Sequence, residues 1–176
     1  VNTILIGSAL YLFLITVRDF LKKRLNNFSQ NLSHFGFSLL ILSILLNNIF
    51  SSEIITNLKV GESFKNEKFE IQFNELKKFQ DKNFVSFKGY FLINENSVSE
   101  KLEPELRVYN QPNIITSEAD IKTTFLTDKF ITMNTVQNEE YFNIRYQVKP
   151  FMLWIWISVL LISFGGVTSL FKRKSL

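Results

Sequence analysis

Residues 150–171, PFMLWIWISVLLISFGGVTSLF, decide the fold, because an apolar run of this length can cross a lipid bilayer as an α-helix, which takes roughly 20 residues. A second apolar run covers residues 32–50. A third, residues 3–17, is shorter than a full span unless upstream sequence completes it. The sequence therefore predicts an integral membrane α-helical protein with three transmembrane helices and a soluble insert before the last one.

The apolar runs divide the chain into six segments. We expect transmembrane helix 1 at residues 1–17, a cytoplasmic connector at 18–31, transmembrane helix 2 at 32–50, an extracytoplasmic β-rich domain at 51–149, transmembrane helix 3 at 150–171 and a cytoplasmic tail at 172–176. Residue 1 is Val, which fits either an alternative start codon or a chain that begins further upstream.

Basic residues set the orientation in the membrane. Seven of the 20 Lys and Arg residues flank the apolar runs: Arg18, Lys22, Lys23, Arg24, Lys172, Arg173 and Lys174. By the positive-inside rule both clusters are cytoplasmic, so the insert lies on the outer side. The insert holds 13 basic and 15 acidic residues, a net charge of −2, so the chain's +4 comes from the flanking clusters. We therefore attribute the net positive charge to the orientation of the helices in the membrane, and we expect no nucleic-acid partner.

The insert has the sequence pattern of strands. Apolar and polar residues alternate in KFEIQFN (68–74) and EEYFNIRYQV (139–148), as on a half-buried β-strand. Polar breaks indicate turns at KVGES (59–63), INENS (93–97) and YNQPN (109–113). We expect a small antiparallel β domain, a sandwich or partial barrel, with one short helix at residues 117–122 that Ser117 and Glu118 begin.

No residue of the insert stands out as catalytic. The chain has no cysteine, which excludes a disulfide, a thiolate metal site and a cysteine nucleophile. The insert also has no histidine to act as a base and no glycine-rich phosphate loop. We assign no catalytic residue and interpret the insert as a binding or scaffolding surface. In the last apolar run, Trp154 and Trp156 fit an interfacial aromatic belt, and Gly165 and Gly166 fit close helix packing.

His34, the only histidine, opens the second apolar run at its cytoplasmic end. At 100° per residue, it shares a helix face with Ser38, Ile41, Leu45 and Asn48. A stripe suited to close packing lies roughly opposite, made of Ser33, Gly36, Leu40, Ser43 and Asn47. The residues alone leave two interpretations open. The imidazole is hydrogen-bonded to headgroup water, or it is a functional group such as an axial ligand to haem iron, which needs a second ligand from elsewhere.

Three blocks form a recognisable set: Pro104-Glu105-x-Arg107-x-Tyr109, Thr116-x-Glu118-Ala119-x-Ile121, and Arg145-x-x-x-Lys149-Pro150-Phe151-x-x-Trp154-Ile155-Trp156 ending in Gly165-Gly166. Together they resemble the C-terminal region of the CcmF/NrfE family, the large haem-lyase subunit of cytochrome c maturation. Leu106 departs from a usual basic residue, and Ser117 is inserted in the second block. The stretch SHFG (33–36) is similar to the family's Ala-His-x-Gly motif, which opens a transmembrane helix.

The resemblance implies a function. Such proteins take haem from a haem chaperone and attach it to the Cys-x-x-Cys-His motif of apocytochrome c. They also hold a b-type haem in the membrane between two histidines on different helices, proposed to keep the incoming haem reduced. His34 matches the second of these ligands, so the resemblance makes it the cofactor-binding residue and an axial ligand to the haem iron. The implied partners are apocytochrome c, the haem chaperone and other cytochrome c maturation subunits, the remainder of the haem lyase, and membrane lipid.

The resemblance also implies a location and a limit. We expect the inner membrane of a bacterium or the mitochondrial inner membrane, with residues 51–149 on the periplasmic or intermembrane side. The family's tryptophan-rich segment and its other haem-ligand histidines precede this region. We therefore expect a fragment or a split-gene product that is not an active enzyme alone. The alternative is a non-catalytic, membrane-anchored assembly or scaffold protein whose β domain docks a partner.

Overall fold

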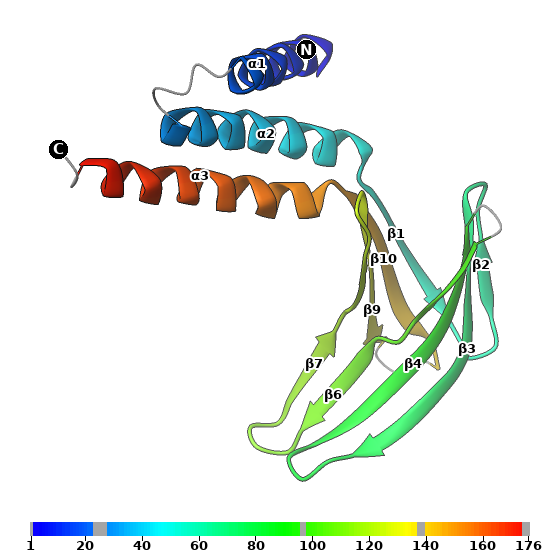
Figure 1. Ribbon diagram of the computed structural model, residues 1–176. Coiled ribbons are helices and arrows are strands. Elements are labelled where there is room, and N and C mark those ends of the chain that lie inside the picture. Colours follow the sequence, from blue (N-terminus) through cyan, green and yellow to red (C-terminus); the bar gives the residue numbers. More distant parts are fainter. Residues whose placement is uncertain (1, 23–27, 96–97, 137–139, 174–176) are drawn as a thin grey trace. The chain divides into compact units, whose positions relative to one another are not determined.

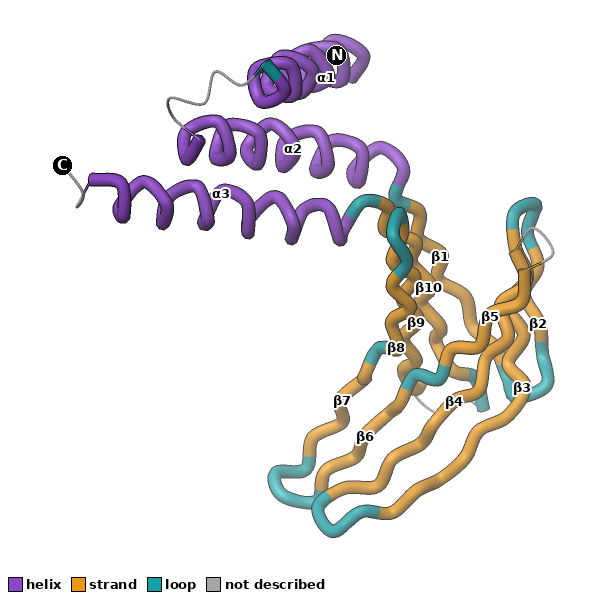
Figure 2. The backbone as a smooth tube through the Cα atoms, viewed as in Figure 1, coloured by secondary structure: helices purple, strands orange, loops and turns teal. Residues whose placement is uncertain are grey.

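The structure is a computed structural model that describes residues 2–22, 28–95, 98–136 and 140–173 (Figure 1). The chain divides into two compact units. One unit comprises residues 1–51, 123–128 and 149–176, and the other comprises residues 52–122 and 129–148. The first unit holds the helices and the second holds most of the strands (Figure 2).

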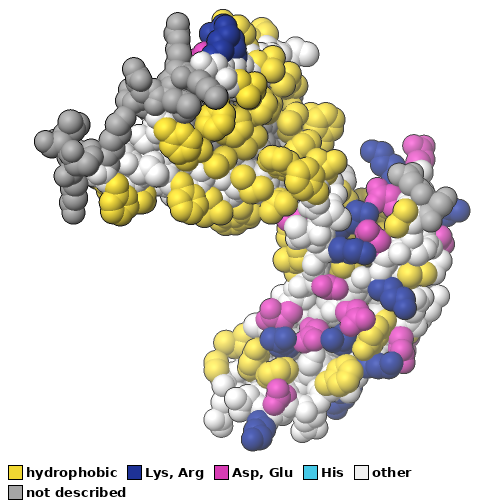
Figure 3. Space-filling view, in the orientation of Figure 1, with side chains coloured by type: hydrophobic (Ala, Val, Ile, Leu, Met, Phe, Trp, Pro, Cys, Tyr) yellow, Lys and Arg dark blue, Asp and Glu magenta, His cyan; other side chains and the backbone are white. Residues whose placement is uncertain are grey.

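Three α-helices make up most of the first unit: α1 (Asn2–Leu21), α2 (Phe28–Phe50) and α3 (Met152–Arg173). Each is long and apolar enough to cross a membrane. Large apolar side chains cover much of their outer surface, as expected where lipid is the solvent (Figure 3). These are the three helices that the apolar runs predicted.

The helix ends differ from the ends of the apolar runs. Helix α1 continues four residues past Val17 and α2 begins four residues before Leu32, because polar residues at a bilayer surface can stay helical while their side chains reach water. Helix α3 begins at Met152, after Phe151 adopts a φ of 62° and so breaks the preceding strand. Three of the seven flanking basic residues, Lys23, Arg24 and Lys174, lie outside the described residues.

The insert folds as an antiparallel β-sandwich. One sheet has the order β1-β10-β9-β8, with β1 (Ser52–Leu58), β10 (Phe142–Pro150), β9 (Thr127–Thr135) and β8 (Asp120–Thr123). The other has the order β2-β3-β4-β6-β7, with β2 (Ser63–Lys65), β3 (Phe69–Gln80), β4 (Phe84–Glu95), β6 (Glu105–Tyr109) and β7 (Ile114–Glu118), and β5 (Val98–Leu102) also pairs with β4. The predicted antiparallel β domain is confirmed.

The alternating residues build the sandwich core. Phe69, Ile71 and Phe73 of β3 are buried, as are Ile144 and Tyr146 of β10. The two strands belong to different sheets, so period-two alternation turns one face of each sheet toward the other. The rings of Phe69 and Tyr146 meet edge to face at 5.1 Å across this space.

The predicted helix at residues 117–122 is wrong, because β7 and β8 occupy this stretch. The hydroxyl of Ser117 does not cap a helix but donates a hydrogen bond to the carbonyl of Met133 in β9, at 2.8 Å. Glu118 pairs with Glu105 in the β6–β7 ladder. Pairing with β6 therefore overrides the local helix signal.

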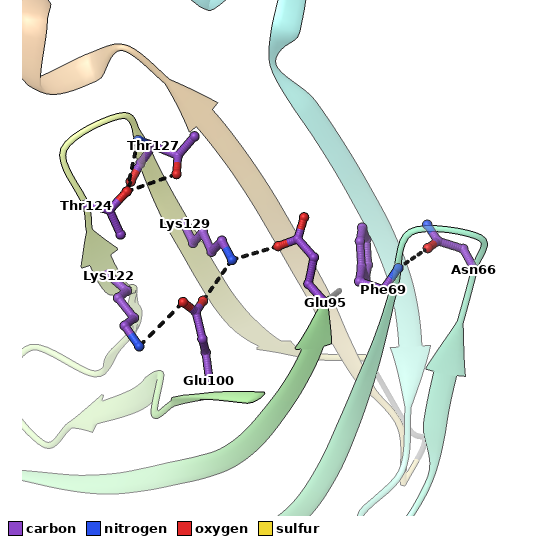
Figure 4. A network of polar contacts seen from close by, with 8 residues as sticks. All are labelled: Asn66, Phe69, Glu95, Glu100, Lys122, Thr124, Thr127 and Lys129. Carbon is purple, nitrogen blue, oxygen red and sulfur yellow. Dashed lines mark hydrogen bonds and ion pairs between the residues drawn. The ribbon is translucent and has the colours of Figure 1, made fainter. Parts of the chain in front are cut away.

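A charged network lies inside the sandwich between β4, β5, β8 and β9 (Figure 4). The ammonium of Lys129 lies 2.7 Å from Glu95 Oε2 and 2.9 Å from Glu100 Oε2. Lys122 lies 3.5 Å from the other oxygen of Glu100. The Lys129 side chain is 13% exposed, so its charge is largely withdrawn from water and depends on the two carboxylates.

Burial and pairing act in opposite directions on these pKa values. Burial by itself raises the pKa of Glu100, but hydrogen bonds and charge from Lys129 and Lys122 outweigh it, so the pKa lies below its ordinary 4.5. Burial likewise lowers the pKa of Lys129, but Glu95 and Glu100 raise it above 10.5. Both groups therefore stay charged over a wide range of pH.

Replacing Lys129 with Met should destabilise the sandwich by about 3 kcal/mol, because both carboxylates lose their shared cation and the carboxylate of Glu100 is largely withdrawn from water. In the intact chain in detergent micelles, we expect the β-sheet circular dichroism to melt at least roughly 10 °C lower. Tyr146→Phe is the matched control. The Tyr146 hydroxyl is buried without a hydrogen-bond partner among the described residues, so its removal should be neutral or slightly stabilising. Equal losses in both variants would contradict a special role for the ion pairs.

The same network should make stability depend on pH at both extremes. The folded-state pKa of Glu100 is lowered, so its contribution is present above about pH 4.5 and is lost as the pH falls through the folded value. The folded-state pKa of Lys129 is raised, so its contribution is present below about pH 10.5 and is lost as the pH rises through the folded value. Melting temperatures measured against pH should show a plateau between these limits. Glu100→Gln should reduce the loss of stability on the acid side, whereas Glu67→Gln, at an exposed site outside the described ion pairs, should leave the profile unchanged.

Candidate functional site

Helix α2, which carries His34, packs against both other helices of its unit. Toward α1, the hydroxyls of Thr16 and Ser38 lie 2.7 Å apart. The Phe35 ring also contacts the rings of Phe13 and Phe20, with centroids 5.7 and 5.9 Å apart. A hydroxyl pair inside an apolar interface satisfies two groups that lipid cannot, so it fixes how α1 and α2 are aligned.

Toward α3, two glycines let the backbones approach. A Cβ on Gly165 would fall 2.1 Å from the Ser33 hydroxyl and 2.8 Å from the Ser29 carbonyl. A Cβ on Gly36 would lie 3.0 Å from the backbone nitrogen of Ile162. The small-residue stripe predicted on α2 is therefore the α3 contact. Gly166 was expected to share this role, but a Cβ there meets no atom within 4 Å.

The predicted face of His34 is divided between two environments. Ser38 is buried against α1, and Ile41 and Leu45 line an apolar groove of about 530 Å³ between α1 and α2. His34 and Asn48 are exposed. Simple helix periodicity could not separate these residues, because it does not say where the neighbouring helix lies.

His34 lies on the part of α2 that neither neighbour covers. Its imidazole has no hydrogen-bond or ion-pair partner among the residues that the structure describes, and it does not line the α1–α2 groove. Its neighbours one turn away are mixed: Phe37 is apolar and 55% exposed, whereas Gln30 and Asn31 are polar. The arrangement offers one imidazole on an exposed helix surface, open to a ligand or another helix.

Two of the sequence blocks lie side by side in the sandwich. Block one lies on β6 and block two spans β7 and β8, and in the β6–β7 ladder Arg107 pairs with Thr116 and Glu105 with Glu118. On one face of this sheet, Glu105 receives hydrogen bonds from Arg107 at 3.1 Å and from Ser86 at 3.2 Å. The Lys88 ammonium lies 3.3 Å from the same carboxylate.

These contacts keep Glu105 ionised. Burial raises the pKa of Glu105, but the hydrogen bonds from Arg107, Lys88 and Ser86 outweigh it and leave the pKa below its ordinary value. The guanidinium of Arg107 also lies 5.1 Å from the centre of the Phe84 ring. Lys88 and Ser86 could not be grouped with the blocks from sequence, because only strand pairing brings β4 beside β6.

The third block joins the sandwich sheet to the helical unit along the chain. In its strand portion, Arg145 forms an ion pair with Glu53 of β1. At the end of β10, the Pro150 carbonyl accepts a hydrogen bond from the side-chain amide of Asn47 at 2.5 Å, which joins the end of α2 to the segment just before α3. The Trp154 indole donates to the Phe125 carbonyl at 3.0 Å. The residues of this block are therefore structural at every contact that the structure describes.

Comparison with known families identifies this architecture. Residues 49–150 match the family model described as the CcmF C-terminal beta-sandwich. The chain belongs to the CcmF family. The matched residues coincide with the sandwich, and the blocks that suggested the family from sequence lie within them or continue into α3.

Individual relatives agree with this assignment. The chain is 30% identical to the cytochrome c-type biogenesis protein CcmF of Pseudomonas fluorescens over 146 residues, which is 82% of this chain and 22% of the relative. It is 25% identical to the cytochrome c-type biogenesis protein NrfE of Haemophilus influenzae over 175 residues, which is 97% of this chain and 28% of the relative. The chain thus spans about a quarter of the length of these relatives.

A solved structure shares the fold. The structure of a cytochrome c haem lyase, CcmF, superposes with a TM-score of 0.64 and covers 88% of this chain and 27% of the solved one. The sequence identity is 16%, so this likeness concerns the fold. The match extends beyond the sandwich, because residues 49–150 make up a smaller share of the chain than the 88% that is covered.

Replacing Gly165 with Leu should disrupt the α2–α3 contact, because the new side chain has no room beside Ser33 and overpacking of this kind costs roughly 1–3 kcal/mol. Both tryptophans of the chain lie on α3, so their fluorescence during thermal unfolding in detergent reports on this helix. We expect a lower melting temperature for Gly165→Leu and an unchanged one for Gly166→Leu, whose added side chain meets open space. Equal behaviour of the two variants would rule out the glycine contact as the determinant of packing.

Proposed function

We propose that this chain serves as the C-terminal part of a membrane haem lyase subunit, helping to attach haem covalently to apocytochrome c. Within that role, His34 contributes one axial ligand to a b-type haem in the membrane. The observation that carries the proposal is the exposed, unpartnered imidazole of His34 on a membrane-spanning helix of a CcmF family member.

The residues present fit one half of a haem site. A neutral imidazole is a standard axial ligand, and the exposed Phe37 ring one turn away offers an apolar contact for the porphyrin of a b-type haem. An imidazole left without a partner in hydrocarbon is costly, which favours a ligand or helix that covers it. His34 is the only histidine here, so the second axial ligand comes from outside this chain.

The helices around His34 determine its orientation. Contact of Gly165 with Ser33 sets the rotation of α2 against α3, and the Thr16–Ser38 hydroxyl pair sets it against α1. These contacts occupy two sides of α2 and leave the side with His34 open. A haem bound there would supply one-electron redox chemistry, and His34 would supply the ligand atom.

The sandwich serves as the docking domain in this proposal. It faces the periplasm of a bacterium, or the mitochondrial intermembrane space, where apocytochrome c and the haem chaperone are met. The support is the charge distribution, with basic clusters beside the helices and an insert of net charge −2. The ordered face around Glu105, Arg107 and Lys88 offers fixed charges for recognising other cytochrome c maturation subunits.

Substituting His34 with Ala tests the ligand assignment. In the purified complete lyase complex, we expect the reduced b-type absorption bands to disappear, or to persist at well under half their intensity, because an axial ligand is lost. Attachment of haem to a Cys-x-x-Cys-His reporter should fall with them. Asn48→Ala is the control, since Asn48 is an exposed polar residue of the same helix and its loss should leave the bands unchanged.

Retention of the bands and of haem attachment in the His34→Ala complex would exclude His34 as a ligand. That result would favour the alternative, a non-catalytic assembly or scaffold protein whose β domain docks a partner. The ion pairs of the β6 face are compatible with such a role, because they hold charged side chains in fixed positions on a surface.

A further inference from the structure

The turn between β8 and β9 belongs to the helical unit, although the strands on either side belong to the sandwich. Residues 123–128 group with α1, α2 and α3. Two hydrogen bonds explain this grouping. The backbone N–H of Phe151 donates to the Leu126 carbonyl at 2.7 Å, and the Trp154 indole N–H donates to the Phe125 carbonyl at 3.0 Å. The turn is thus bound to the first residues of α3.

Threonine side chains hold the turn in one conformation (Figure 4). The backbone N–H of Thr124 donates to the Thr127 carbonyl at 2.9 Å, and the Thr124 hydroxyl donates to the same carbonyl at 2.7 Å. In return, the N–H of Thr127 donates to the Thr124 hydroxyl at 3.1 Å. The two residues between them, Phe125 and Leu126, are therefore presented at the tip of a closed turn.

The tip of this turn is apolar, whereas a turn that faces water usually consists of polar residues. Phe125 is 63% exposed and Leu126 is 53% exposed, although the Phe125 ring packs edge to face on Trp154 at 4.9 Å. By contrast, the β3–β4 turn at residues 81–83 is polar, and the β6–β7 turn at residues 110–113 consists of polar residues and a proline. Adjacent exposed Phe and Leu at a preformed tip are typical of a surface that is covered by something apolar.

The hydrogen bonds place the tip beside the outer end of a membrane-spanning helix. Phe151 immediately precedes the membrane-spanning helix Met152–Phe171, and Trp154 lies in its first turn. At the same level, Asn47 at the end of α2 donates to Pro150. Tryptophan side chains concentrate at the boundary between headgroups and acyl chains, where an apolar ring and a polar N–H are both satisfied.

We infer that the turn at residues 123–128 is an interfacial anchor, with Phe125 and Leu126 inserted among the lipids beside the outer end of α3. The occupant of this surface is the bilayer itself, because the tip is bonded to a lipid-facing helix at the depth where aromatic residues partition. The Trp154 indole, whose N–H is satisfied by the turn, links the anchor to the helix. This inference rests on the membrane-spanning helices and not on haem binding.

Spin labelling of the intact chain in lipid nanodiscs tests the anchor, and the absence of native cysteine makes each engineered thiol the only one in the chain. Three sites have matched exposure: Leu126→Cys at the tip (53%), Leu160→Cys on mid-α3 (56%) and Ile115→Cys on β7 of the sandwich (56%). For each nitroxide, collision with oxygen, which concentrates in lipid, is measured against collision with a water-soluble nickel chelate. Phe125→Cys provides a second site on the same turn, and unchanged β-sheet circular dichroism verifies folding.

We expect the oxygen-to-nickel accessibility ratio at residue 126 to exceed that at residue 115 several-fold and to fall below that at residue 160, as at headgroup depth. Two results would overturn the inference. High nickel and low oxygen accessibility would place the tip in water. Low accessibility to both reagents would mean that protein covers it, as when another helix or subunit packs there. Neither result bears on haem binding by His34, so failure of the anchor and failure of the proposed function are distinguishable.

Discussion

The close contact between Gly165 of α3 and the Ser29–Ser33 turn of α2 is the constraint on which the arrangement depends. It allows the two helices that flank the insert to lie against each other, and Asn47 then joins their outer ends through Pro150. The chain consequently leaves and re-enters the helical unit at adjacent points. The first and last strands of the insert, β1 and β10, can pair from Ser52 and Val148 onward, and this pairing begins the four-stranded sheet. A bulkier residue at Gly165 would therefore disturb the helix pair.

The sandwich contains both an apolar core and a network of ion pairs. The core residues of β3, β4, β9 and β10 are apolar, with Phe73 and Phe91 stacked at 4.3 Å. Beside this core, the ammonium of Lys129 is paired with carboxylates from β4 and β5. A buried cation between two acids adds specificity for one strand arrangement, because an alternative register would leave a charge without a partner. The Glu105 cluster repeats this principle on the opposite side of the six-stranded sheet, closer to water.

The sequence predicted most of the architecture, and its failures have physical causes. Period-two alternation identified β3 and β10 because each has one face in the core, and three apolar runs identified the helices. The proposed helix at residues 117–122 failed because Ser117 and Glu118 carry a local helix signal, whereas their actual partners, Met133 and Glu105, are distant in sequence. The candidate residue His34 was found because it is the only histidine. Its environment was not predictable, because helix periodicity placed it with Ser38 while only the structure shows that α1 covers Ser38 and leaves His34 open. The ion pairs of Lys88 and Lys129 could not be predicted either, because their acidic partners lie on other strands and become neighbours only when the strands pair.

Because of the turn at residues 123–128, the insert as it is read from the sequence and the sandwich as a compact unit do not contain the same residues. The insert is continuous in sequence, yet six of its residues belong to the helical unit, so the chain passes between the two units at four places instead of two. A sandwich excised at residues 51 and 149 would carry Phe125 and Leu126 away from Trp154 and expose them to water, which favours aggregation. Exchange of this domain between relatives would be similarly constrained. A transplanted sandwich must bring a turn that matches the helix of its new host, so the turn and the start of α3 are inherited as one module.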